Sequence, residues 1–268
     1  MNKITVIDQL SREVVIPFPP KRIVSLVPSQ TELLHALALD SEVTGITKFC
    51  IHPAEWSNTK VRIGGTRQLK LDVIRKLHPD LILANKEEND ADQVKALMQE
   101  FPVWVSDVHN LDSATDMIRR VGMIANRTDS AKEIADRIAQ QFRHLLPPAS
   151  PFEGDENTVL YLIWRRPWMT VGGDTFIHDM LGRCGLQNAF AAGRRYPQLS
   201  DDEIRAGNSR YVFLSSEPYP FREKHSAEIK NLLPQAKIML VDGEMFSWYG
   251  SRLLQAAAYM AKLREKMR

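Results

Sequence analysis

The loops that follow the predicted strands hold the side chains best suited to chemistry. Cys50 and His52 stand two residues apart in one of them, and thiolate and imidazole are good ligands for zinc, iron or cobalt. A structural zinc site uses four ligands, however, and no other Cys or His stands at a matching spacing. Alternatively, Cys50 could act as a nucleophile, His52 as its base, and a carboxylate such as Glu244 as the group that orients the base. We favour the simpler interpretation that Cys50 and His52 pack at the loop.

Other signs of catalysis are weak. No hydrolase signature surrounds Cys50, and Gly172-Gly173-Asp174 has neither of the glycine spacings that hold a dinucleotide or a triphosphate. The backbone N–H groups of these glycines could hold an anionic ligand edge, although a tight turn explains them equally well. We therefore predict a binding protein and not an enzyme.

Aromatic residues gather in the predicted loops. These loops hold three of the five tryptophans, and large exposed rings favour a bulky, flat, apolar ligand. Each ring taken alone is more simply explained as a core residue. Two arginine pairs, Arg165-Arg166 and Arg194-Arg195, are flanked by aromatics and not by further cations, which is typical of a pocket and not of a phosphate-binding track. The rings are Phe49, Trp164, Trp168, Tyr196, Phe246, Trp248 and Tyr249.

The elements that position these loops alternate between strand and helix in the first part of the chain. Short apolar runs predict strands, and runs with helical spacing predict the helices between them. Ser29 and Glu32 are spaced to cap the first helix. Such alternation is typical of a parallel sheet flanked by helices. The predicted strands are 22–28, 43–47, 81–84 and 103–105, and the helices are 29–38, 71–77 and 91–100.

A long helix is predicted over 129–146, where apolar residues recur at helical spacing without glycine or proline. The polar, proline-rich segment that follows marks a boundary. A second α/β lobe then repeats the plan, with strands at 159–163, 211–214 and 238–241 and helices at 175–181 and 253–266. We expect an N-terminal lobe over 1–110, a helical linker over 111–150 and a C-terminal lobe over 151–268.

The two lobes also share a register. Asp72, Leu81 and Glu87 each have a counterpart 130 positions later, at Asp202, Tyr211 and Glu217. A common offset indicates duplication of one lobe. Helix-then-strand patterns resemble one another in any α/β protein, so chance similarity remains the alternative.

Composition limits the classes of function. The 268 residues contain 35 Lys and Arg against 33 Asp and Glu, and a net charge of +2 without clustering argues against a nucleic-acid partner. No apolar run is long enough to cross a bilayer. Asp8, Arg12 and Glu13 interrupt the place of a signal peptide, so we expect either a cytoplasmic chain or one whose export signal is missing. Two cysteines leave the compartment open.

Several motifs together resemble the substrate-binding proteins of ATP-driven vitamin B12 importers, and more widely the helical-backbone receptors for iron chelates and haem. The resemblance covers nearly the whole chain. It rests on Lys21-Arg-Ile-Val-Ser-Leu-Val-Pro-Ser-Gln-Thr-Glu32, Gly64-Gly-Thr66, Leu77-His-Pro-Asp-Leu-Ile-Leu-Ala84, Val171-Gly-Gly-Asp-Thr175 and Tyr196-Pro-Gln-Leu-Ser200.

This resemblance implies two lobes joined by one long backbone helix, with a ligand gripped between them by aromatic side chains. It places Asp72 and Asp202 where family members present an acidic residue to a membrane permease, although glutamate is usual there and either aspartate could simply favour its helix N-terminus. It also makes His52 a candidate axial ligand to corrinoid cobalt. The residues expected to bind ligand are Phe49, Arg165, Trp168, Tyr196, Phe246 and Trp248.

Together with the residues, this resemblance implies a monomeric, non-catalytic receptor that binds cobalamin or a related corrinoid and delivers it to an ABC permease. It also implies a periplasmic or membrane-associated location, with the cytoplasm as the alternative. The first alternative is a haem or ferric-siderophore receptor, in which the arginine pairs would contact ligand carboxylates. The second is a cytosolic metal-handling or thiol-dependent enzyme that uses Cys50 and His52.

Overall fold

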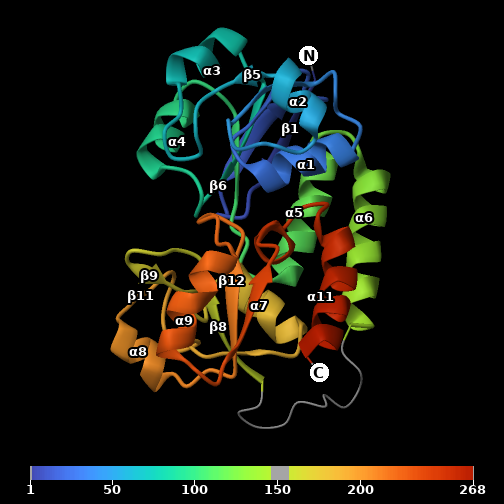
Figure 1. Cartoon of the computed structure of the whole chain (residues 1–268). Coiled ribbons are helices and arrows are strands. Elements are labelled where there is room, and N and C mark those ends of the chain that lie inside the picture. The colour runs from blue at the N-terminus through green and yellow to red at the C-terminus, as the bar shows by residue number, and fades with distance from the viewer. Residues whose placement is uncertain (1, 146–156, 268) are drawn as a thin grey trace. The chain divides into compact units, whose positions relative to one another are not determined.

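The computed structural model describes residues 2–145 and 157–267, which divide into two compact units (Figure 1). The chain passes from one unit to the other more than once. Unit 1 comprises Met1–Val108, Asp112–Ile138 and Trp248–Leu254, and unit 2 comprises His109–Leu111, Ala139–Ser247 and Gln255–Arg268.

Unit 1 is built on a five-stranded parallel sheet. Its strand order is β5-β4-β3-β6-β7, and nearly every residue of the three central strands and β7 is buried. Continuous apolar runs of this kind are required where helices cover both faces of a sheet. The strands are β3 (Ile23–Ser25), β4 (Val43–Ile46), β5 (Val61–Arg62), β6 (Leu81–Asn85) and β7 (Val103–Ser106).

Four helices flank this sheet. Right-handed crossovers place α1 and α2 on one face and α3 and α4 on the other, as Figure 1 shows. The predicted cap of α1 is wrong: the helix begins after Val27 with Pro28 in its first turn, and no side chain caps it, because proline has no N–H to satisfy. The helices are α1 (Pro28–Ala36), α2 (Ala54–Thr59), α3 (Leu71–Leu77) and α4 (Ala91–Met98).

An antiparallel hairpin, β1 (Lys3–Ile7) with β2 (Glu13–Pro17), precedes this sheet and was not predicted. Its turn protects the outer edge of β7. The Gln9 amide nitrogen donates to the carbonyl of Val105, and the Val105 amide donates to the carboxylate of Asp8. Unpaired strand edges invite association, so this cover is a protective feature.

The predicted connecting helix corresponds to α6 (Thr128–Arg143), and α5 (Leu111–Ile124) precedes it. A short turn separates the two helices, with Asn126 at a positive φ of 58°. Ala131, Ala135 and Ile138 recur on the buried side of α6. The boundary between the units falls inside α6, after Ile138. The predicted lobe boundary at 150/151 lies outside the described residues.

Unit 2 contains a four-stranded parallel sheet of order β10-β8-β12-β13 and a small antiparallel pair, β9 with β11. Its core packs leucine and valine side chains of β8 and β12 against isoleucine side chains of α8 and α9. The strands are β8 (Thr158–Leu162), β9 (Trp168–Met169), β10 (Gln187–Asn188), β11 (Gln198–Leu199), β12 (Tyr211–Ser215) and β13 (Lys237–Val241).

Two helices of unit 2, α7 and α8, begin at residues whose side chains cap them. Thr175 accepts from the His178 amide at the start of α7, and Ser200 and Glu203 form a full capping box at α8. The C-terminal helix α11 starts in the segment that belongs to unit 1. The helices are α7 (Phe176–Arg183), α8 (Asp201–Ala206), the 3-10 turn η2 (Glu223–His225), α9 (Ser226–Leu232), α10 (Glu244–Ser247) and α11 (Leu253–Met267).

The two sheets share one plan. The strand order β4-β3-β6-β7 of unit 1 matches β10-β8-β12-β13 of unit 2, with every neighbouring pair parallel. Strands β6 and β12 begin at Leu81 and Tyr211, the offset of 130 read from the sequence. The predicted α/β class is confirmed, and the common strand order supports the predicted duplication.

Candidate functional site

The loop after β4 in unit 1 presents the most exposed predicted ligand residue. The ring of Phe49 is 51% exposed, and Ile51 beside it is 52% exposed. A Cβ at Gly65 would lie only 3.1 Å from that ring, so the glycine allows Phe49 to lie close over the backbone. The ammonium of Lys48 lies 4.9 Å from the ring centroid. The loop therefore offers an apolar surface at the carboxyl edge of the sheet, where ligands of parallel sheets bind.

Cys50 points the other way, into the core of unit 1. Its sulfur lies 3.1 Å from the hydroxyl of Thr31 and 3.2 Å from that of Thr47. Burial is the main cause that raises the pKa of the thiol above its ordinary value. A thiol held neutral is a poor nucleophile and a poor metal ligand, because both roles need the thiolate. Within residues 2–145 and 157–267, no group of three or more His, Cys, Asp or Glu side chains could hold a metal ion.

His52 contacts an aromatic ring. Its imidazole meets the indole of Trp248 edge to face, with ring centroids 5.5 Å apart. The guanidinium of Arg252 lies 5.3 Å from the same indole. Trp248 is therefore almost fully buried, with 6% of its surface exposed. It supports the loop of His52 and offers a ligand little surface of its own.

The segment Trp248–Leu254 is bound firmly to unit 1. The hydroxyl of Tyr249 donates to a carboxylate oxygen of Glu88 at 2.6 Å, and Arg252 forms a salt bridge with Glu32 at 2.7 Å. Burial and then the charge of Glu88 raise the pKa of Tyr249 well above its ordinary value. A Cβ at Gly250 would lie 2.4 Å from the carbonyl oxygen of Ser29, so only glycine fits there.

In unit 2, the loop after β8 builds an aromatic cluster together with the loop after β12. Trp164 and Met169 pair as an isolated antiparallel bridge, so the chain reverses direction between them. Trp168 lies next to Met169 in β9. The rings of Trp168 and Phe221 stack within 8° of parallel, and Trp164 meets Tyr219 edge to face at 5.6 Å. We call Trp164, Trp168, Tyr219, Phe221 and His225 the unit-2 aromatic cluster.

Two carboxylates hold this cluster. Arg165 makes a two-pronged salt bridge to Glu228, with nitrogen–oxygen distances of 2.6 and 2.7 Å. The Trp168 indole N–H donates to Asp201 at 3.1 Å. The hydrogen bonds to Glu228 are the main cause that raises the pKa of Arg165. Arg165, predicted to contact ligand, thus has its guanidinium engaged by a neighbour.

The remaining predicted ligand residues of unit 2 differ in exposure. Tyr196 is half-buried in the loop before β11. Arg194 is exposed, and its guanidinium comes no closer than 4.0 Å to Asp174. Phe246 is fully buried, because it packs against Tyr161 in the core with its ring centroid 5.4 Å away. A ring without exposed surface cannot contact a ligand, so we assign Phe246 to the core.

The predicted docking residues occupy matching positions in the two units. Asp72 in the first turn of α3 binds Arg75 at 2.9 Å, and Asp202 in the first turn of α8 binds Arg205 at 2.7 Å. Both carboxylates point outward, with side chains 89% and 94% exposed. The two aspartates can therefore reach a partner without any rearrangement of the unit that carries them.

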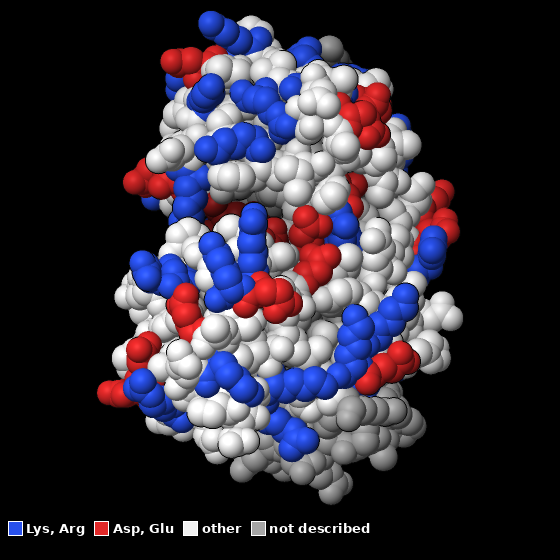
Figure 2. All heavy atoms as spheres, in the orientation of Figure 1, with Lys and Arg blue, Asp and Glu red and all other residues white. Residues whose placement is uncertain are grey.

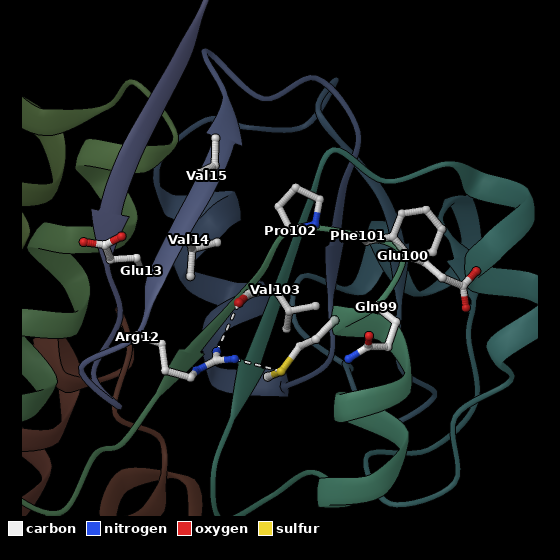
Figure 3. A pocket seen from close by; sticks show the side chains of 10 residues that line it. Arg12, Glu13, Val14, Val15, Gln99, Glu100, Phe101, Pro102 and Val103 are labelled. Carbon is white, nitrogen blue, oxygen red and sulfur yellow. Dashed lines mark hydrogen bonds between the residues drawn. The ribbon is translucent and has the colours of Figure 1, made fainter.

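A hollow of about 350 Å³ lies elsewhere in unit 1, between the β1–β2 hairpin and the end of α4 (Figure 3). Arg12 crosses it and donates to the sulfur of Met98 and the carbonyl of Val103. The hollow opens beside the amino end of β7, away from the loop of Phe49. None of the predicted ligand residues lines it.

Sequence reasoning did not identify the residues that fix these loops. Glu228 and Arg252 reach their partners from 63 and 220 positions away in the chain. Glu32 was interpreted as part of a helix cap. A signal for such pairs would be correlated change of both positions among related sequences, which one sequence does not contain.

The surface carries charges of both signs. Figure 2 shows Lys and Arg interspersed with Asp and Glu on the face it presents, which agrees with the small net charge of +2. None of the helices in the described part of the chain has the length and apolar character needed to span a membrane.

A model of the periplasmic binding protein family matches residues 23–235, well over half of the chain. The chain belongs to this family. Its members are non-enzymatic components of transport systems. The family assignment agrees with the parallel sheets and exposed loop aromatics of both units.

Two curated relatives align with most of this chain and with most of their own length. The chain is 26% identical to an uncharacterised ABC transporter substrate-binding lipoprotein of Bacillus subtilis, over 97% of this chain and 84% of the relative. It is 24% identical to a vitamin B12-binding protein of Vibrio campbellii, over 74% of this chain and 71% of the relative.

Solved structures share the fold. The periplasmic vitamin B12-binding protein of Vibrio cholerae superimposes with a TM-score of 0.76 at 19% identity, over 94% of this chain and 99% of that chain. A periplasmic haem-binding protein of Roseiflexus superimposes with a TM-score of 0.78 at 20% identity, over 92% of this chain and 98% of that chain. At these identities the likeness concerns the fold alone.

Proposed function

We propose that this family member is the substrate-binding protein of an ABC importer and that its ligand is cobalamin or a related corrinoid. The observation that carries the proposal is the exposure of large aromatic side chains at the carboxyl edges of the sheets. Phe49 is 51% exposed in unit 1 and Trp164 is 40% exposed in unit 2. Exposed rings cost free energy in water and suit a bulky ligand with apolar faces.

The relatives supply the choice of ligand. One curated relative is named as an ABC transporter substrate-binding lipoprotein and the other as a vitamin B12-binding protein. Phe49, Trp168 and Tyr196 are the exposed or half-buried rings that we assign to ligand contact, and Trp248 supports the loop that carries His52. His52 lies at the same loop and is retained as a candidate ligand to cobalt.

Delivery to a permease is assigned to Asp72 and Asp202. Their side chains are 89% and 94% exposed and occupy equivalent helix positions in the two units. Exposed carboxylates suit arginine side chains on a membrane partner. We further propose that the protein acts outside the cytoplasmic membrane, in the periplasm or attached to the membrane surface, as the names of its relatives imply for them.

Haem is the second candidate ligand. The likeness to a haem-binding protein and the exposed guanidinium of Arg194 favour it, since haem carries carboxylates that arginine binds well. A thiol-dependent enzyme has less support, because burial raises the pKa of Cys50 and keeps its thiol neutral.

The deciding experiment is a competition between ligands. Purified protein is titrated with cyanocobalamin, haemin and a ferric siderophore, and binding is followed by heat and by the ligand spectrum. The proposal predicts that cyanocobalamin binds at least about tenfold more tightly than the other two, a difference of about 1.4 kcal/mol. Tighter binding of haemin or of the siderophore would contradict the corrinoid proposal and would assign that ligand to the protein instead.

A further inference from the structure

The salt bridge between Arg165 and Glu228 lies against the unit-2 aromatic cluster. Two guanidinium nitrogens of Arg165 donate to two carboxylate oxygens of Glu228, at 2.6 and 2.7 Å. The arginine side chain is only 16% exposed, whereas the glutamate is 40% exposed. The cation is therefore shielded and its partner anion faces solvent.

The guanidinium also contacts the ring of a predicted ligand residue. It lies 5.9 Å from the ring centroid of Trp168, whose indole N–H donates to Asp201. Trp168 thus has one cation and two carboxylates around it. The pair uses two of the five N–H donors of Arg165 and offsets its positive charge, so this arginine attracts a second carboxylate less strongly than an unpaired guanidinium would.

Nearby cations do not cancel the negative charge of Glu228. Arg166 and Arg222 are exposed on the adjoining loops and Lys224 is exposed in η2, where water screens their charge. His225 of the cluster has its pKa lowered, first by burial and then by Lys224 and Arg165, which favours its neutral form. Glu228 and Asp201 are the carboxylates held in place beside the rings, and Glu228 is the one that is paired with the shielded Arg165.

We infer that Glu228 is a specificity-determining residue, which admits ligand edges that carry uncharged amides and disfavours edges that carry carboxylates. An amide N–H can donate to the free lone pairs of Glu228, whereas a ligand carboxylate is repelled by it. The inference rests on the proposed function, because it takes the unit-2 aromatic cluster as a ligand-contacting surface.

The test uses a matched pair of ligands. Cyanocobalamin and its monocarboxylic acid derivative differ by one peripheral amide replaced by a carboxylate. For each protein variant, the ratio of the dissociation constant of the acid to that of the amide measures discrimination against the charge. Wild-type protein is predicted to give a ratio above one.

Two variants should move this ratio in opposite directions. Glu228→Gln removes the repelling charge and frees Arg165, and should lower the ratio about 3- to 10-fold. Arg165→Gln leaves Glu228 without its cation and should raise the ratio. Glu223→Gln is the control, because it makes the same change in net charge at an exposed glutamate of η2. Its ratio should stay within about twofold of wild type.

The outcomes separate this inference from the proposed function. If cobalamin binds and Glu228→Gln behaves like Glu223→Gln, the specificity role is wrong while the receptor role stands. If wild-type protein binds neither corrinoid, the corrinoid proposal is wrong. The same variants are then compared on haemin and its dimethyl ester, where Glu228→Gln should favour haemin by the same factor. Equal ratios for Glu228→Gln and Glu223→Gln, or no binding of either porphyrin, would overturn the inference.

Discussion

Glu32 and Arg252 form a largely buried salt bridge although 220 positions separate them in the chain, with their closest atoms 2.7 Å apart. The pair holds the segment Trp248–Leu254 on unit 1, while β13 before it and most of α11 after it belong to unit 2. It also places the Arg252 guanidinium 5.3 Å from the indole of Trp248. Loss of the pair should therefore affect both stability and the loop of His52.

We predict that Glu32→Gln lowers the free energy of unfolding by about 1.5–3 kcal/mol, because a mostly buried charge-assisted hydrogen bond is lost. Urea unfolding followed by tryptophan fluorescence measures the change. Glu55→Gln is the matched control in the same unit, since Glu55 is 64% exposed and lies 3.4 Å from His35. The control should change stability by less than about 0.5 kcal/mol. Equal effects of the two substitutions would contradict the structural role of the pair.

Phe49→Ala should weaken cobalamin binding about tenfold or more, because an exposed ring that contacts ligand carries much of the binding free energy. Its stability should stay within about 0.5 kcal/mol of wild type, since the ring is 51% exposed. Val61→Ala, at another exposed apolar residue of unit 1, is the control. Titration calorimetry and thermal unfolding give both quantities. Unchanged affinity in Phe49→Ala would remove this loop from the ligand site.

Asp72→Arg and Asp202→Arg should each impair transport while ligand affinity stays unchanged, because reversed charge repels the arginines proposed on the permease. The matched control is Asp92→Arg in α4. Asp92 is 91% exposed and lies 3.4 Å from Lys95, the same arrangement of an acidic residue in the first turn with a cation three residues later. Ligand-stimulated ATP hydrolysis by the reconstituted transporter measures docking. Loss of stimulation in Asp92→Arg to the same extent would show a general charge effect.

The two cysteines should be unreactive in the folded protein. Burial raises the pKa of Cys50 and raises the pKa of Cys184 to about 12, so little thiolate forms at pH 8. A chromogenic disulfide reagent should label both thiols in urea and neither within minutes under native conditions. Rapid native labelling of Cys50 would revive its role as a nucleophile or metal ligand.

The same pKa shifts give stability a pH dependence. In the unfolded chain a cysteine ionises near pH 8.5, whereas in the folded protein burial raises the pKa of both thiols, that of Cys184 to about 12. The unfolded state then binds fewer protons, so the free energy of unfolding should fall as pH rises above about 8.5. Replacement of both cysteines by serine should reduce this slope between pH 8.5 and 10, measured by urea unfolding. An unchanged slope would show that other groups cause it.

Much of the fold could be predicted because local pattern and fold agree along most strands and helices. Helix α3 was predicted with its observed bounds, since its apolar spacing and flanking breakers leave little choice. The environments of the aromatic residues were harder to predict from the sequence. Phe246 and Trp248 are two positions apart, yet one packs in the core of unit 2 and the other against unit 1.

This difference depends on where the chain crosses between units, which side-chain types do not encode locally. The salt-bridge partner of Arg165 was also not encoded in the local sequence. Its sequence neighbours are aromatic, and a free guanidinium for ligand carboxylates was the natural hypothesis. Glu228, 63 positions away, forms a salt bridge with it, and only the tertiary structure brings that partner to the loop.

Titration of the purified protein with cyanocobalamin by isothermal calorimetry tests the receptor proposal most directly. The proposal predicts one ligand per chain with a dissociation constant of about 1 μM or tighter, equivalent to about −8 kcal/mol. Phe49→Ala should weaken this binding and Val61→Ala should not. Absence of cobalamin binding at tens of micromolar protein and ligand would contradict the proposal.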